Sequence, residues 1–250
     1  MRFIVGNWKM YLDGKSQVAL AKKMAKLIKP GKVEVGIAPS FVSMQAVKAE
    51  LAGSKIMVGG QDIATAENGA YTGEISPVEL KAICDFVIVG HSERRKYQGE
   101  SDAEIAAKVE LAIRHDITPI LCVGESLHEN NEELTFTIVN DQVEAGLRNI
   151  TAQEIEKVVI AYEPVWSLYP SNLPVEPNHA VKVAQHIRMT IGELYGDEAG
   201  DKIRILYGGS VDVSNAVDFL IDGLDGALVG HASTRADDFE HIIKLANDKG

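Results

Sequence analysis

Val158-Val159-Ile160-Ala161-Tyr162-Glu163-Pro164-Val165-Trp166 is an apolar run that ends in a carboxylate and a proline. Continuous apolar residues predict a strand that is buried on both faces, as in a parallel sheet. Pro164 cannot donate to a hydrogen-bond ladder, so we expect the strand to end at Glu163. Burial disfavours a charged carboxylate, which suits a general base near neutral pH. An ordinary surface charge at a strand end is the alternative.

Similar runs recur along the chain and are bounded by turn residues. Including the first, eight strands are predicted, at residues 3–8, 33–38, 55–59, 86–90, 118–123, 158–163, 204–207 and 226–229. Most of them are continuous apolar runs rather than alternating ones. This pattern is typical of parallel strands covered by helices on the outside.

Segments with helical patterns and start signals lie between these runs. Ser76-Pro77 and the Ser101/Glu104 pair are such signals. Helices are predicted at residues 15–29, 40–51, 78–84, 101–115, 131–149, 177–195, 214–221 and 233–247. Eight strands that each lead into a helix predict an α/β fold, a single closed (β/α)8 barrel domain over residues 1–250. A doubly wound open sheet competes, but no Gly-x-Gly-x-x-Gly follows the first strand.

Composition limits the classes of function. The formal net charge is −11, which argues against nucleic acid as a partner. There is no apolar run of membrane-spanning length, and a strand pattern directly follows Met1, so we expect neither a membrane segment nor a secretory leader. Cys84 and Cys122 lie in apolar contexts and indicate a reducing cytoplasm rather than a disulfide framework. No pair of histidines has the spacing of a zinc site, so we expect no metal.

Polar groups follow several of the predicted strands. Asn7 and Lys9 follow the first, His91 follows the fourth, and Glu163 ends the sixth. Glycine-containing loops follow the seventh and eighth strands, where (β/α)8 barrels often bind phosphate through backbone N–H groups. In a closed barrel all of these positions lie on the same rim. Taken singly, each of these residues also has a non-functional interpretation, such as a surface lysine or a structural histidine.

The chain resembles the triosephosphate isomerase family over its whole length. Five segments carry the resemblance and occur in the right order: Asn7-Trp8-Lys9, Gly69 to Glu74, Gly90-His91-Ser92-Glu93-Arg94, Tyr162 to Trp166, and Tyr207-Gly208-Gly209-Ser210. The resemblance implies a TIM barrel that interconverts dihydroxyacetone phosphate and D-glyceraldehyde 3-phosphate. It also implies that the enzyme acts in glycolysis and gluconeogenesis and needs no cofactor.

The resemblance further implies roles for individual residues. Glu163 moves a proton between adjacent carbons, and His91, at the start of a short helix over residues 92–97, acts as a neutral electrophile. Lys9 supplies positive charge, and Asn7 donates a hydrogen bond in the same oxyanion site. Glu93 is expected to pair with Lys9. The alternative is a purely structural ion pair with one of the two arginines that follow it.

Further positions are implied around this site. Cys122 is expected to pack near the base rather than to react. The residues expected to bind substrate and its phosphate are Asn7, Lys9, Tyr169, Ser210, Gly230 and His231.

The segment over residues 67–74 is expected to enter a partner subunit, with Thr72 and Glu74 in the dimer loop. A homodimer is therefore implied. The alternative is an ordinary glycine-rich surface loop.

Two departures from the family pattern lie in segments that are expected to bind the phosphate. The lid over residues 167–174 has prolines at 170 and 174 and lacks glycines, which changes its conformational freedom. His231 stands where the family usually has glycine. Its side chain either points to solvent while its backbone N–H is used, or adds an imidazole donor to the phosphate.

Two weaker functional hypotheses follow from these departures. A poorly closing lid would let the enediolate lose phosphate and form methylglyoxal. The other hypothesis is a non-catalytic barrel that serves as a binding or structural protein. The presence of Asn7, Lys9, His91 and Glu163 argues against it.

Overall fold

The computed structural model describes residues 1–168, 171 and 173–249. Eight parallel strands close into a barrel in chain order, with the last strand paired to the first. The strands are β1 Phe3–Asn7, β2 Glu34–Ala38, β3 Ile56–Gly60, β4 Phe86–Val89, β5 Thr118–Val123, β6 Val159–Tyr162, β7 Arg204–Tyr207 and β8 Gly226–Val229. The predicted closed (β/α)8 barrel is therefore confirmed.

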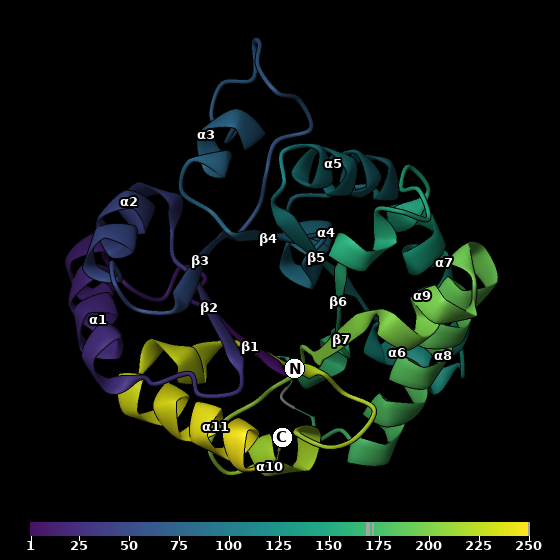
Figure 1. Ribbon diagram of the computed structural model, residues 1–250. Helices are drawn as coiled ribbons and strands as arrows, with labels where there is room; N and C mark the ends of the chain where they lie inside the picture. The colour runs from purple at the N-terminus through teal and green to yellow at the C-terminus, as the bar shows by residue number, and fades with distance from the viewer. Residues whose placement is uncertain (169–170, 172, 250) are drawn as a thin grey trace.

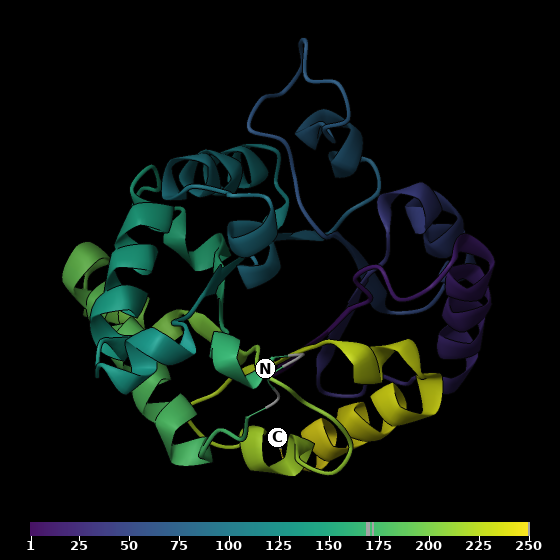
Figure 2. The same cartoon turned by 180° about the vertical axis from the view of Figure 1, so that it is seen from behind.

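Helices surround the strands as an outer ring (Figures 1 and 2). They are α1 Gly14–Leu27, α2 Phe41–Glu50, α3 Pro77–Lys81, α4 Ser92–Tyr97, α5 Asp102–Arg114, α6 Leu127–Asn131, α7 Thr135–Leu147, α8 Pro177–Tyr195, α9 Asp197–Lys202, α10 Ala216–Phe219 and α11 Ala236–Asp248. Three 3-10 turns complete them: η1 Ile155–Lys157, η2 Val165–Ser167 and η3 His231–Thr234. In the part of the chain that the structure describes, no helix combines the length and apolarity needed to span a membrane.

Some helix boundaries differ from the prediction. The helix expected over 131–149 begins at Thr135, because Glu133 has a φ of 60° and interrupts it. A separate short helix, α6, precedes it and is opened by a capping box between Ser126 and Glu129. The helix expected from 233 begins at Ala236, since η3 occupies the turn before it.

The core has two layers, which explains why the strand sequences are continuously apolar. Phe3 and Val5 of β1 point into the barrel, whereas Ile4 packs against the helices. Phe86 fills the barrel interior opposite Gly59, where an added Cβ would lie 2.1 Å from the phenyl ring. Both faces of each strand are therefore buried, and polar groups are confined to the strand ends.

The segment between β3 and α3 extends away from the barrel (Figures 1 and 2). Its base is closed by a hydrogen bond from Ala64 N–H to the Ile75 carbonyl (2.9 Å) and one from Ser76 Oγ to the Glu67 carbonyl (2.6 Å). Residues 68–74 are all exposed. The fold therefore presents Thr72 and Glu74 at the tip of a projecting loop.

Candidate active site

The polar residues that follow the strands meet at one rim of the barrel. Asn7, Lys9, His91 and Glu163 line a cavity of about 920 Å³, although they come from three strands far apart in sequence. The same cavity is lined by Ser210, Gly230 and His231 from the loops after β7 and β8. The prediction that these residues lie together on the rim is confirmed. Their chemical roles remain predictions.

Glu163 is held firmly but keeps one oxygen without a well-aligned partner. The residue is 1% exposed, and its Oε2 accepts a hydrogen bond from Ser92 N–H (3.0 Å). Its Oε1 lies 3.1 Å from His91 Nε2 but makes no hydrogen bond of good geometry with the described residues. Gly208 leaves room for it, because a Cβ there would lie 2.8 Å from Glu163 Cγ. A buried carboxylate oxygen is thus aimed into the cavity.

His91 is the N-cap of α4, and its orientation fixes its tautomer. The backbone N–H of Glu93 donates to Nδ1 (3.2 Å), so Nδ1 carries the lone pair and the proton of a neutral ring is on Nε2. His91 therefore presents an N–H donor toward Glu163 and the cavity.

Lys9 has a strained backbone that its surroundings support. Its φ is 45°, which is uncommon for a residue other than glycine. Asn7 Oδ1 accepts from the Lys9 N–H (3.0 Å), and Gln61 Nε2 donates to the Lys9 carbonyl (2.9 Å). The ammonium lies 2.6 Å from Glu93 Oε1, the pairing expected from the sequence. The amine is thereby placed beside the helix that begins at His91.

Cys122 lies directly beside the Glu163 carboxylate. Burial, and then the negative charge of Glu163, raise the pKa of the Cys122 thiol well above its usual range. The thiol is therefore a neutral packing group at working pH. It also lines a smaller cavity of about 300 Å³ behind Glu163.

The loops after β7 and β8 offer unsatisfied donors on the other side of the cavity. Neither the Ser210 N–H nor the His231 N–H donates to a backbone acceptor in the described ranges. His231 itself begins η3, so its N–H is at the open end of that turn. These groups suit an anion. Tyr169, which was expected to contribute as well, lies outside the described residues, as do Pro170 and Asn172.

Sequence comparisons agree with this geometry. A sequence model of the triosephosphate isomerase family matches residues 2–246. The chain belongs to this family. It is 44% identical to a triosephosphate isomerase of Caldanaerobacter subterraneus subsp. tengcongensis over 242 residues, which are 96% of this chain and 97% of that protein. The triosephosphate isomerases of Thermoanaerobacter sp. and Clostridium botulinum are 43% and 40% identical over the same shares of the chains.

In this member of the triosephosphate isomerase family, a buried carboxylate that the sequence did not single out anchors the start of the lid. Glu125 is fully buried and accepts hydrogen bonds from Trp166 Nε1 (3.0 Å) and Tyr162 Oη (3.2 Å). Burial raises the pKa of the Glu125 carboxyl. The Leu173 N–H donates to the Trp166 carbonyl (3.3 Å) and joins the two ends of the lid. The only sequence signal was the place of Glu125 just after β5.

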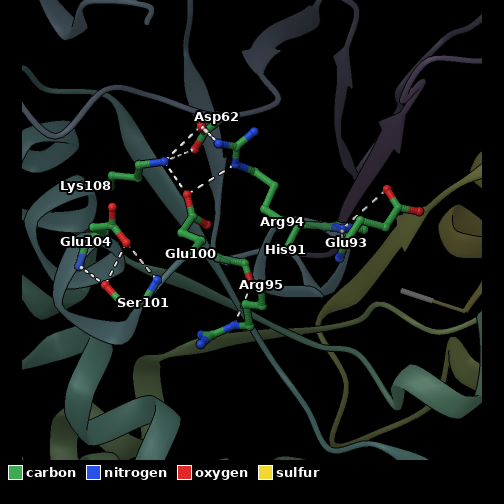
Figure 3. A network of polar contacts seen from close by, with 10 residues as sticks. Asp62, His91, Glu93, Arg94, Arg95, Glu100, Ser101, Glu104 and Lys108 are labelled. Carbon is green, nitrogen blue, oxygen red and sulfur yellow. Dashed lines mark hydrogen bonds and ion pairs between the residues drawn. The ribbon is translucent and has the colours of Figure 1, made fainter. Parts of the chain in front are cut away.

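A second unforeseen group is a buried charge network next to α4 (Figure 3). The Lys108 ammonium contacts both oxygens of Asp62 (2.8 and 2.9 Å) and also Glu100. Arg94 reaches Asp62 (2.8 Å) and Glu100 (3.2 Å) from α4. The network therefore ties the chain after β3 and the helix α5 to the helix that His91 caps. Asp62 is distant in sequence from the other three members, and no local pattern marks the group.

Proposed function

We propose that the protein is a triosephosphate isomerase, which interconverts dihydroxyacetone phosphate and D-glyceraldehyde 3-phosphate. One observation carries the proposal: a buried carboxylate oxygen of Glu163 and the Nε2–H of His91 converge 3.1 Å apart in a cavity whose far side offers free backbone N–H groups. A base and an acid are thus within reach of adjacent substrate atoms. The family model and the relatives, which carry the name triosephosphate isomerase, agree with it.

The proposed reaction is a proton transfer between adjacent carbons. Glu163 Oε1 removes a proton from the carbon next to the carbonyl, and the electron pair of that C–H bond forms the double bond of an enediolate. His91 Nε2–H donates to the oxygen on which negative charge develops, an arrangement that is established for this family. His91 gives its Nε2 proton to the former carbonyl oxygen and takes up the proton of the adjacent hydroxyl. Glu163 then returns its proton to the neighbouring carbon. The reaction needs no cofactor, because the atoms balance without one.

Lys9 and Asn7 complete the proposed oxyanion site. The Lys9 ammonium places positive charge near the developing oxyanion, and its pairing with Glu93 (2.6 Å) fixes its position. The strained backbone of Lys9 is consistent with a functional requirement for this geometry. The free N–H groups of Ser210 and His231 and the Gly230 turn would hold the phosphate.

The test of this proposal is turnover together with phosphate release. We expect steady-state isomerisation of glyceraldehyde 3-phosphate with less than about one inorganic phosphate released per hundred turnovers, because a closed site protects the enediolate from elimination. A coupled assay and a colorimetric phosphate assay measure the two products. Negligible isomerisation by the folded protein would refute the proposal. Stoichiometric phosphate release would instead support the methylglyoxal-forming alternative.

We also propose that the single barrel domain works as a cytoplasmic homodimer. The projecting loop, with residues 68–74 exposed, provides a surface that a second copy would cover. Tyr71 is 52% exposed there, so a second copy would bury a large aromatic side chain. The two buried free cysteines suit a reducing compartment.

The dimer is tested by replacing Tyr71 and Thr72 with Asp. We expect sedimentation to change from dimer to monomer at micromolar protein, because two charges would have to be buried in the interface. The pair Val213→Asp and Ser214→Asp, on the exposed loop after β7, is a matched control outside the projecting loop. A wild-type protein that sediments as a monomer would contradict the proposal.

A further inference from the structure

Three side chains form a connected cluster at the rim of the cavity, next to the loops after β7 and β8. The rings of Tyr11 and His231 meet edge to face at 5.3 Å between centroids. Arg235 Nη1 lies 3.4 Å from His231 Nδ1. All three line the same cavity as Glu163 and Lys9. The sequence interpretation considered His231 alone and assigned nothing to Arg235 or Tyr11.

The contact between Arg235 and His231 sets the direction of both side chains. A guanidinium can only donate, so Nδ1 of His231 must accept and the proton of its neutral ring is on Nε2. The guanidinium is thereby held against the loop that contributes the His231 N–H. His231 acts in this arrangement as a support for Arg235, in addition to supplying its backbone donor.

Arg235 retains unused hydrogen-bonding capacity. Of its five N–H groups, Nε–H is directed at Asp238 Oδ2 and one Nη1–H at His231. Within the described residues, no other acceptor is found for this side chain, which is 53% exposed. Its charge also acts on Asp212, two residues beyond Ser210, and contributes to lowering the pKa of that carboxyl after the hydrogen bonds from Ser214 and Asn215. Arg235 therefore lines the cavity together with residues of both loops whose N–H groups are free.

The charges around the cavity indicate a role for the Arg235 side chain in binding an anion. Lys9 is already paired with Glu93, while Glu163, Asp212 and Asp218 contribute negative charge to the lining. A dianionic phosphate at the β7 and β8 loops is stabilised by a cation that still has N–H donors without an acceptor. Arg235 offers planar, paired N–H donors that match phosphate oxygens.

We propose that Arg235 is a specificity-determining residue that binds the substrate's phosphate, with His231 positioning its guanidinium. The proposal rests on the proposed isomerase function, and it names a side-chain contact to the phosphate beyond the backbone N–H groups. Asp238 competes with the phosphate for the same guanidinium.

The test compares Arg235→Gln with Lys244→Gln, a control that removes one positive charge from α11 outside the cavity. For Arg235→Gln we expect KM for glyceraldehyde 3-phosphate to rise about five- to tenfold, with kcat changed less than about twofold. The kcat/KM for unphosphorylated glyceraldehyde should not change, because it lacks the group that Arg235 binds. Arg235→Lys should recover part of the loss, and Asp238→Asn should lower KM about twofold.

Binding of inorganic phosphate, followed by phosphorus NMR, provides a readout that does not depend on turnover. Arg235→Gln is expected to raise the Kd for phosphate by about the same five- to tenfold factor. If the wild-type enzyme does not isomerise triose phosphates, the proposed function fails, yet this measurement still decides the role of Arg235. KM and Kd that match those of Lys244→Gln would overturn the proposal. So would an equal loss with glyceraldehyde, since it would indicate general damage to the site.

Discussion

Replacing Glu163 with Gln is expected to lower kcat for glyceraldehyde 3-phosphate by about 10³- to 10⁴-fold, since it removes a general base at the reacting carbon. The amide keeps the size of the side chain and can still pack beside Cys122. KM is expected to stay within about twofold, because the residue does not lie among the free N–H groups at the phosphate end. Steady-state kinetics on the folded variant measure both constants.

Glu163→Asp is the matched control for position. It keeps the carboxylate but draws it back by about one carbon–carbon bond, away from its contact with His91 Nε2 at 3.1 Å. We expect kcat to fall by about 10²-fold, less than with Gln, because misplacement by about 1 Å is costly but leaves a base in the site. If Glu163→Gln retained kcat within tenfold of wild type, another group would have to be the base.

Replacing Lys108 with Met is expected to lower the free energy of unfolding by about 3–5 kcal/mol. The side chain of Lys108 is 4% exposed and lies between Asp62 and Glu100, whose side chains are 9% and 3% exposed. Without the ammonium, two carboxylates would be left close together with only Arg94 opposite them. Burial already raises the pKa of the Asp62 carboxyl in spite of Lys108. Urea denaturation followed by circular dichroism measures the change.

Two further variants show whether the loss comes from unpaired charge. Lys244→Met removes an exposed lysine that pairs with Glu240 one helical turn away, and we expect a change within about 0.5 kcal/mol. Adding Asp62→Leu and Glu100→Leu to Lys108→Met should recover part of the loss, because both buried carboxylates are then gone and Arg94, whose side chain is 33% exposed, can reach water. A loss below about 1 kcal/mol for Lys108→Met would mean that water reaches the network.

The barrel could be predicted from the sequence because its signals are local. A strand that is buried on both faces is apolar at nearly every position, so each of the eight strands can be recognised as a continuous apolar run. Helices that begin at Ser76-Pro77 or at the Ser101/Glu104 box also carry their start signals in adjacent residues. Once eight strands alternate with helices, the closed sheet places all strand ends on one rim. This rule predicts that Asn7, Lys9, His91 and Glu163 lie together.

The contacts between these residues arise from the tertiary packing. The 3.1 Å approach of His91 to Glu163 and the pairing of Lys9 with Glu93 depend on how the closed barrel brings the ends of β1, β4 and β6 to one rim. The same holds for the group formed by Asp62, Arg94, Glu100 and Lys108, whose members lie on different elements. Periodicity reports which face of an element is buried, but not which polar partner faces it.

The phosphate end of the cavity also combines features that can be predicted from the sequence with contacts that cannot. The position of His231 after β8, with a backbone N–H at the phosphate end, can be predicted from the sequence. The contacts of this ring with Arg235 Nη1 and with the Tyr11 ring depend on the fold. The reason is physical: apolar burial acts on every residue of an element and leaves a repeating pattern. A single hydrogen bond or ion pair between distant residues leaves none.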